Sequence, residues 1–323
     1  MLNKQQFKQS SIYYEITQGK MMHSIMLIGN DDKMLDIYAQ NIITTMFCLG
    51  ADKPCEQCIN CQKIMHNTFV DVCVYPQNGE VLKSDELNRM LDTVFELPFE
   101  ADKKVYIINN FANIDQLLQN KLLKTLEEPP EHSYFILKVN NESKVLQTIK
   151  SRCQKINVPN LNIMELTEYL YSFEKSQKVG EAIQFCDGSL SRAEHYLKSE
   201  NFLSNVEFVF NMLQNLKKSW QIADFASVLY AKKDEFLDIM HIYLKILQNA
   251  IYEVVGIEEK IDLKGHSSEL LNIAQTFSLD AMSNMIKSTT MMLEKLDRNC
   301  NYNTIIDEFL LGILEDKHKW PIS

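Results

Sequence analysis

The sequence predicts an α/β domain with a parallel sheet, followed by a mostly helical region. Short, continuously apolar segments alternate with helix-like segments through the first half of the chain, as expected for strands that helices cover on both faces. These strand signals stop after Val158 and Pro159, and helical periodicity dominates from about Phe202 onward. Glycine and proline are scarce, at 9 and 7 of 323 residues, so long disordered linkers are not expected.

Strands and helices are predicted to alternate along the first half. Each strand is a short apolar run, and the strands are expected at 24–29, 70–75, 105–108 and 134–139. The helices between them are expected at 33–47, up to about 67, after 84, and at 114–128. Ser84 is the predicted N-cap of the helix whose apolar stripe begins at Leu87. Pro129 and Pro130 end the last of these helices.

Composition excludes several classes of protein. The formal net charge of −10 disfavours strong, autonomous binding to nucleic-acid phosphates. No apolar run approaches the ~18–20 residues needed to cross a bilayer, and the N-terminus has no apolar signal-peptide core. Eight cysteines without a secretion signal favour reduced thiols or metal ligation over disulfides. We therefore expect a cytoplasmic protein with no membrane partner.

A cysteine cluster follows the first long helix. Cys48, Cys55, Cys58 and Cys61 have the spacing C-x6-C-x2-C-x2-C. Four thiolates satisfy tetrahedral Zn²⁺ with no open position, so the expected site is structural. An iron–sulfur cluster is the rival, because C-x2-C-x2-C also opens the bacterial ferredoxin run, but the x3-C-P continuation is absent. Four free thiols are the remaining alternative.

A strand-to-helix turn occupies the place where a phosphate-binding loop would stand. A working P-loop reads GxxxxGK[ST], whereas this chain reads Gly29-Asn30-Asp31-Asp32-Lys33-Met34. The second glycine is missing, methionine replaces the hydroxyl that binds Mg²⁺, and two aspartates would repel phosphate. The alternative is an ordinary α/β turn that never bound nucleotide.

The acidic pair that such a site needs is also absent. Asn109 and Asn110 follow the third predicted strand, where two carboxylates would hold Mg²⁺ and polarise water. An asparagine side chain is neutral and does not serve as a general base. We therefore expect no ATP bound or hydrolysed by this chain itself, with Gly29, Lys33, Asn109 and Asn110 as remnants of a nucleotide site.

Several segments in order resemble one family, the delta-prime subunits of the bacterial DNA polymerase III clamp loader. More loosely, they resemble its tau/gamma paralogues. The resemblance includes the four cysteines after the first helix. It also rests on motifs spread over most of the chain, which are LLKTLEEPP (122–130), FILKVNNESK (135–144), TIKSRCQKI (148–156), GSLSRAEHY (188–196) and RNCNYNTIIDEFLL (298–311).

The resemblance implies a fold and a division into domains. It implies a RecA-like AAA+ core over residues 1–158, with the four-cysteine zinc module embedded at 48–61. A small helical lid is expected at 159–203, and a C-terminal helical collar that holds a five-subunit assembly is expected at 204–323. Tau/gamma subunits keep an intact P-loop, so the degenerate turn at Gly29 favours the delta-prime branch.

The resemblance also implies a role for the tripeptide Ser151-Arg152-Cys153. In the family, the arginine of this motif reaches across a subunit interface towards ATP on an adjacent tau/gamma subunit. Arg152 is therefore the expected arginine finger in trans, whose fixed charge stabilises the transferred phosphoryl group. Ser151 and Cys153 are expected to shape and pack the loop. Arg192 lies where AAA+ lids carry a second nucleotide-sensing arginine, and a structural salt bridge is the interpretation we favour for it.

The predicted function is that of a clamp-loader subunit without catalytic activity of its own. Its expected partners are the delta and tau/gamma subunits, with the sliding clamp and primed DNA reached through the complex. Two alternatives stay open at this stage, a divergent tau/gamma-like ATPase and a zinc-containing nucleic-acid-binding protein.

Overall fold

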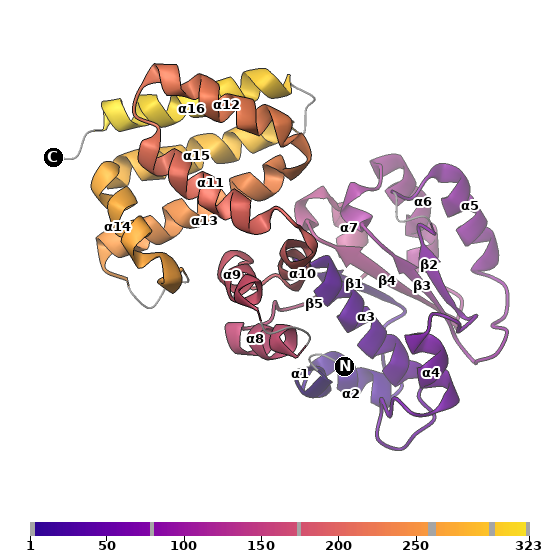
Figure 1. The fold of residues 1–323 in the computed structure, drawn as a ribbon. Helices are drawn as coiled ribbons and strands as arrows, with labels where there is room; N and C mark the ends of the chain where they lie inside the picture. Colours follow the sequence, from indigo (N-terminus) through magenta and orange to yellow (C-terminus); the bar gives the residue numbers. More distant parts are fainter. Residues whose placement is uncertain (1–3, 78–80, 173–175, 258–262, 297–300, 321–323) are drawn as a thin grey trace. The chain divides into compact units, whose positions relative to one another are not determined.

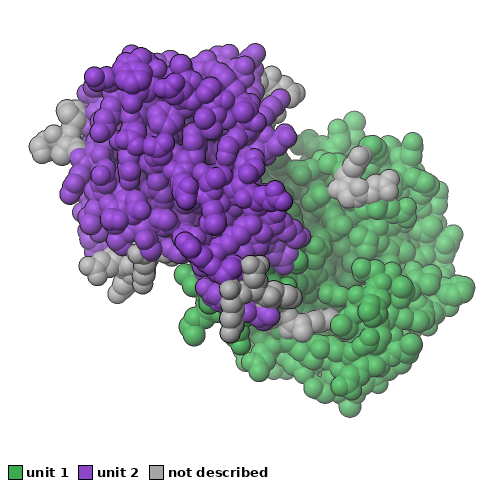
Figure 2. All heavy atoms as spheres, viewed as in Figure 1, with its two compact units in different colours: residues 1–169, 188–191 green, residues 170–187, 192–323 purple. Residues whose placement is uncertain are grey.

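The computed structural model describes residues 4–77, 81–172, 176–257, 263–296 and 301–320. The chain divides into two compact units, which Figure 2 colours separately. Unit 1 comprises residues 1–169 together with 188–191, and unit 2 comprises residues 170–187 and 192–323. The three-domain division expected from the sequence stays a prediction.

Unit 1 is built on a five-stranded parallel sheet with strand order β2-β3-β4-β1-β5 (Figure 1). The strands are β1 (Ser24–Ile28), β2 (Val72–Tyr75), β3 (Lys104–Ile108), β4 (Ser133–Val139) and β5 (Gln154–Asn157). The apolar runs at 24–29, 105–108 and 134–139 are confirmed as strands, and the run at 70–75 forms a strand that starts two residues late. The central strands β3 and β4 are buried nearly throughout, which explains why their sequences are continuously apolar.

The fifth strand was missed by the sequence analysis. In β5, Gln154, Lys155 and Asn157 accompany a single apolar residue, Ile156, and the burial alternates along the strand. The strand lies at the edge of the sheet, where it pairs with β1 from Ile25↔Gln154 to Ile28↔Asn157. An edge strand needs few apolar side chains, so its conformation depends on pairing rather than on local composition.

Helices cover both faces of this sheet (Figure 1). α3 packs on one face, whereas α5, α6 and α7 contribute to the apolar core on the other face with side chains such as Leu87, Leu122 and Ile149. The helices of this part of the chain are α1 (Lys4–Lys8), α2 (Ser11–Thr17), α3 (Asp32–Phe47), α4 (Ile59–Met65), α5 (Ser84–Thr93), α6 (Gln116–Glu127), α7 (Gln147–Lys150) and α8 (Ile163–Tyr171), with short 3-10 turns at Phe111–Asn113 and Glu142–Lys144.

Two helix starts differ from the sequence prediction. Lys83, not Ser84, is the N-cap of α5, and the Ser84 hydroxyl instead accepts a hydrogen bond of 3.0 Å from Lys121 Nζ. The helix predicted from 114 begins two residues later, because Asp115 caps α6 by accepting from the Leu117 amide at 2.7 Å. The Asp115 carboxylate thus makes a local capping bond, whereas the Ser84 hydroxyl makes a tertiary contact.

Unit 2 is helical, as the periodicity predicts. Its core combines aromatic and aliphatic side chains from all of its long helices. The helices after residue 175 are α9 (Gln177–Phe185), α10 (Leu190–Lys198), α11 (Phe202–Asn215), α12 (Ile222–Ala231), α13 (Phe236–Val255), α14 (Ser267–Thr276), α15 (Leu279–Leu296) and α16 (Tyr302–Lys319). Among the helices of the described residues, none combines the length and the apolar character that a bilayer crossing requires.

Candidate functional site

The N-terminus of α3 is filled by a carboxylate of the chain itself. Asp31 is 1% exposed, and its Oδ1 accepts the N–H of Met34 at 2.9 Å as an N-cap. Its two oxygens also accept hydrogen bonds from Ser189 Oγ at 2.7 Å, from the Ser191 amide at 2.9 Å and from Ser191 Oγ at 2.8 Å. The anionic group therefore lies where helix amides and the helix dipole favour negative charge.

The hydrogen bonds around Asp31 keep it ionised despite its burial. Burial alone would raise the pKa of the Asp31 carboxyl, but donors from Ser189, Ser191 and Met34 outweigh it and lower the pKa below its ordinary value. A charged oxygen pair with four donors at a helix N-terminus has the chemistry of a bound phosphate. The N-terminus of α3 thus already carries an anionic group of the chain itself.

Gly29 and Lys33 also make contacts within unit 1. A side chain at Gly29 would place its Cβ 3.1 Å from the Val158 carbonyl oxygen and 3.3 Å from Leu35 Cδ2, so tight packing alone accounts for the glycine. The Lys33 amide donates to Ser191 Oγ at 3.1 Å. The backbone of this turn therefore binds residues 188–191 of the same unit.

Asn109 and Asn110 end β3 with different roles. The Asn109 amide donates to the Tyr75 carbonyl at 2.7 Å, which extends the β2–β3 pairing by one residue. Asn110 has a φ of +50°, in the left-handed region that asparagine tolerates better than most residues. Its carbonyl accepts the Asn113 amide at 2.9 Å, so this asparagine shapes the turn into the following 3-10 helix.

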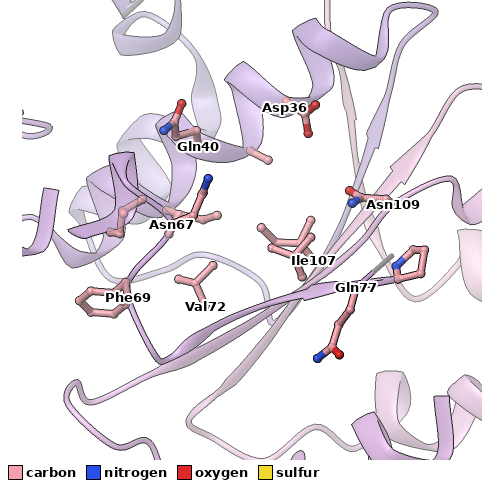
Figure 3. A pocket seen from close by; sticks show the side chains of 13 residues that line it. Asp36, Gln40, Asn67, Phe69, Val72, Gln77, Ile107 and Asn109 are labelled. Carbon is pink, nitrogen blue, oxygen red and sulfur yellow. The ribbon is translucent and has the colours of Figure 1, made fainter. Parts of the chain in front are cut away.

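A cavity of 660 Å³ lies between α3 and the sheet. Figure 3 shows Asp36 and Gln40 of α3 on one side of it and Val72 and Ile107 of the sheet on the other. Asn109 lies at one end, with a buried Oδ1 that has no hydrogen-bond partner among the described residues. No lysine, arginine or histidine occurs among the described residues that line the cavity, so it is unsuited to a nucleotide's phosphates.

The Ser151-Arg152-Cys153 tripeptide follows α7 directly. The Arg152 side chain is 33% exposed and forms an ion pair with Glu127 at the end of α6. Its Nη1 also donates to the Thr148 carbonyl at 2.7 Å. A longer contact of 3.5 Å joins Nη1 to Ser151 Oγ. The structure therefore places the guanidinium at the surface of unit 1, held by three acceptors.

The two neighbours of Arg152 make contacts within unit 1. The Ser151 hydroxyl donates to the Thr148 carbonyl at 3.0 Å, where Ser151 caps α7. Cys153 is 7% exposed and joins the apolar core under α5, α6 and α7. Burial raises the pKa of the Cys153 thiol to about 12, which makes the thiolate scarce at neutral pH and argues against nucleophilic chemistry.

The four predicted cysteine ligands come together. The sulfurs of Cys48, Cys55, Cys58 and Cys61 all lie within 4.8 Å of one another. Tetrahedral coordination with bonds of ~2.3 Å requires sulfur–sulfur distances of ~3.8 Å, so small shifts would complete the site. The donor set is all sulfur, and a metal ion that prefers thiolates fits it.

Backbone amides point at two of these sulfurs, whereas burial raises the pKa of the Cys61 thiol. Amides of Gly50 and Cys55 each donate to Cys48 Sγ at 3.3 Å. Hydrogen bonds from the Gln57 and Cys58 amides lower the pKa of the Cys55 thiol to about 6. A Cβ at Gly50 would lie 2.9 Å from Cys55 Cβ, so only glycine allows the turn to close on the sulfurs.

Arg192 forms an ion pair with an acid of its own unit. Its Nη1 lies 3.1 Å from Asp187 Oδ2, and the other Asp187 oxygen lies 2.6 Å from Lys245 Nζ. This network within unit 2 agrees with the structural salt bridge favoured for Arg192.

Sequence reasoning missed the partners of the Asp31 and Arg152 side chains. An aspartate directly before a helix is an N-cap signal and points to Asp31 as a cap, but nothing local indicates its bonds to serines 158 and 160 residues away. Glu127 was part of the LLKTLEEPP motif, yet its pairing with Arg152 depends on how α6 and α7 pack.

The pH dependence of stability tests the state of Asp31. We expect Asp31→Asn to destabilise the chain by about 1–3 kcal/mol at pH 7, since the four charge-assisted hydrogen bonds to Asp31 are weakened or lost. The folded-state pKa of Asp31 is lowered, so its contribution is present above the unfolded pKa of ~3.9 and is lost as pH falls through the folded value. Urea unfolding from pH 7 to pH 3 should show the gap between variant and wild type closing.

The matched control is Asp92→Asn, which removes an exposed carboxylate from α5. It should shift the unfolding free energy by less than about 0.5 kcal/mol at any of these pH values. A gap for Asp31→Asn that keeps its full size at pH 3 would show that the carboxylate is not ionised in the folded chain.

In sequence, the chain is similar to known subunits of bacterial DNA polymerase III. A family profile described as "DNA polymerase III, delta subunit" matches residues 4–162. The DNA polymerase III delta' subunit of Bacillus subtilis strain 168 is 21% identical over 310 residues, which cover 94% of each chain. The gamma subunit of Buchnera aphidicola subsp. Baizongia pistaciae is 29% identical over 164 residues, covering 50% of this chain and 44% of that protein.

The match to gamma subunits is therefore partial, since the chain spans less than half the length of this relative. Among solved structures, a gamma subunit-related protein from Thermotoga maritima aligns with a TM-score of 0.46 at 15% identity, covering 95% of this chain and 100% of that one. In sequence, the delta' subunit of B. subtilis matches nearly end to end. With the family profile over the sheet-bearing half, this match shows that the chain belongs to the delta-prime family of DNA polymerase III clamp-loader subunits.

Proposed function

We propose that this chain is a non-hydrolysing clamp-loader subunit that supplies Arg152 in trans to ATP on an adjacent tau/gamma subunit. The observation that carries the proposal is a contrast between two charges. The helix N-terminus that would bind a phosphate is filled by the buried Asp31 carboxylate, whereas the Arg152 guanidinium lies at the surface. A chain arranged in this way can act on a nucleotide only if another subunit holds it.

The chemistry of Arg152 is electrostatic. As ATP is cleaved, negative charge redistributes over the transferred phosphoryl group and the leaving oxygen, and a positioned guanidinium stabilises that charge. Arginine fingers of this kind accelerate hydrolysis by ~10³–10⁵-fold, which corresponds to roughly 4–7 kcal/mol of the barrier. Lysine is a poor substitute, because it lacks the planar fork of donors.

The alternative of a divergent ATPase has less support. It requires an anion site at α3, but Asp31 fills that position, and Asn109 and Asn110 offer no carboxylate for Mg²⁺. The alternative of an autonomous nucleic-acid binder is disfavoured by the net charge of −10. An ATP titration and a gel shift with the isolated chain distinguish these three functions.

Assembly follows from the family relationship. We propose that the chain works in the cytoplasm with delta and tau/gamma subunits, and that it reaches the sliding clamp and primed DNA through the complex. The AAA+ core would extend to residue 158 and the helical lid to residue 203, and the collar would join the subunits.

Zinc is the metal proposed for the cysteine cluster. Cys48, Cys55, Cys58 and Cys61 would hold it with no position open for substrate, so the ion would brace the insertion between α3 and α4. Such sites contribute apparent folding free energies of ~10–16 kcal/mol in zinc-finger peptides.

Replacing Arg152 tests the function in trans. In a complex reconstituted with the delta and tau/gamma subunits, we expect Arg152→Ala to remove hydrolysis at the one served site. The reason is that a ~10³-fold slower site drops out of the first turnover. A rapid-quench experiment with clamp and primed DNA should show one ATP fewer hydrolysed per complex in the burst.

Arg89→Ala is the matched control, because Arg89 is an exposed arginine on α5 of the same unit. It should leave the burst unchanged, and Arg152→Lys should restore little of it. An unchanged burst for Arg152→Ala in a fully assembled complex would falsify the proposal. Micromolar ATP binding to the isolated chain, measured by calorimetry, would instead support the divergent ATPase.

Metal analysis tests the zinc site. The chain purified without chelator should contain one zinc ion per molecule by plasma mass spectrometry. Cys58→Ser should lose the ion and lower the thermal midpoint, because a three-thiolate site binds more weakly. Cys73→Ser is the control, since Cys73 lies outside the cluster on β2, and it should keep the ion. Iron with sulfide in the protein, or no metal at all, would contradict the zinc assignment.

A further inference from the structure

The Arg152 guanidinium is held from two sides. Its Nη1 donates to the Thr148 carbonyl at 2.7 Å, and its Nη2 pairs with Glu127 Oε1. Among the described residues, its Nε–H has no hydrogen-bond partner, and the side chain is 33% exposed. A longer contact of 3.5 Å joins Nη1 to Ser151 Oγ. A guanidinium has five N–H donors, so Arg152 can keep all three acceptors and still offer donors to an anion.

We propose that Glu127 is a positioning residue, which sets the orientation of the Arg152 guanidinium towards a phosphate on the neighbouring subunit. This inference rests on the proposed function of Arg152. Glu127 does not touch the nucleotide in this scheme. It acts by limiting the rotamers of a long side chain, so that less freedom is lost when the phosphate is contacted.

The scaffold that carries Glu127 is rigid enough for this role. Glu127 is the last residue of α6, and Leu122 and Leu126 of that helix share a buried core with Ile149 of α7. The helix ends here because Pro129 and Pro130 follow. The distance between the carboxylate and the base of Arg152 is therefore set by packing.

A buried glutamine links the two helices further. Gln119 of α6 is fully buried, and its Nε2 donates to the Ile114 carbonyl at 3.0 Å and to the Lys144 carbonyl at 3.2 Å. Its Oε1 accepts the Leu146 amide, the N-cap residue of α7, at 3.0 Å. A satisfied buried amide of this kind fixes α7, and with it Arg152, relative to α6.

The pair is too exposed to be explained by stability. The side chains of Arg152 and Glu127 are 33% and 43% exposed, and ion pairs at such positions contribute little to folding. Because Arg152 keeps unused N–H donors, a phosphate can accept from them without displacing Glu127. Glu127 would therefore orient the Arg152 guanidinium and leave it able to contact a phosphate.

Substituting Glu127 in the reconstituted complex tests this role. The activity that depends on Arg152 is the difference between the wild-type complex and the Arg152→Ala complex. We expect Glu127→Gln to reduce that difference by about 3- to 10-fold, by lowering kcat while KM for ATP is unchanged, with assembly intact. In the Arg152→Ala background, Glu127→Gln should have no further effect, because it acts through the arginine.

Glu128→Gln is the matched control, since Glu128 is the adjacent exposed acid and the change removes the same charge. It should leave the activity at the wild-type level. Full activity of Glu127→Gln in a complex where Arg152→Ala is defective overturns the positioning role alone. Equal losses from Glu127→Gln with and without Arg152 also overturn it, because they indicate a structural effect. No loss from Arg152→Ala itself overturns the proposed function and this inference together.

Discussion

The hydrogen bonds of the buried Asp31 carboxylate join the N-terminus of α3 to residues 188–191, and this part of unit 1 depends on them. Transferring a carboxylate out of water is costly unless hydrogen bonds replace the solvent. Here an amide of α3 and three donors from Ser189 and Ser191 replace it. Because those serines are 158 and 160 residues away, the same charge that caps α3 also holds residues 188–191 within unit 1. Capping and long-range anchoring are therefore one interaction.

Much of the sheet could be predicted because its central strands are buried on both faces. The runs that form β1, β3 and β4 are apolar at nearly every position, and this signal is local. β5 gives no such signal, since its residues are mostly polar and the strand exists through its ladder with β1. Ser84 illustrates the same limit, because it lies one residue after the N-cap of α5 and its hydroxyl accepts from Lys121 of another helix.

In the candidate site too, contacts that are local in sequence could be predicted, whereas long-range contacts could not. The four cysteines are close in sequence, so their spacing alone predicted that their sulfurs would meet. Arg152 was identified by the motif around it, but its acceptor Glu127 lies on a different helix. The serines that bind Asp31 are more distant still. Contacts of this kind depend on tertiary packing, and a single sequence carries no periodic pattern that would reveal them.

Three positions of the degenerate nucleotide site, one of them the retained glycine, have a structural use. Gly29 allows close approach of the Val158 backbone, Asn110 adopts a left-handed conformation, and Asp31 supplies the anion that α3 would otherwise take from a ligand. Under the proposed function, a P-loop residue in place of Asp31 would remove these contacts before it created a phosphate site. Arg152 differs from all three, because its contacts are at the surface and leave donors unused. Under the proposed function, such a charge, neither buried nor saturated, is available to a neighbouring subunit.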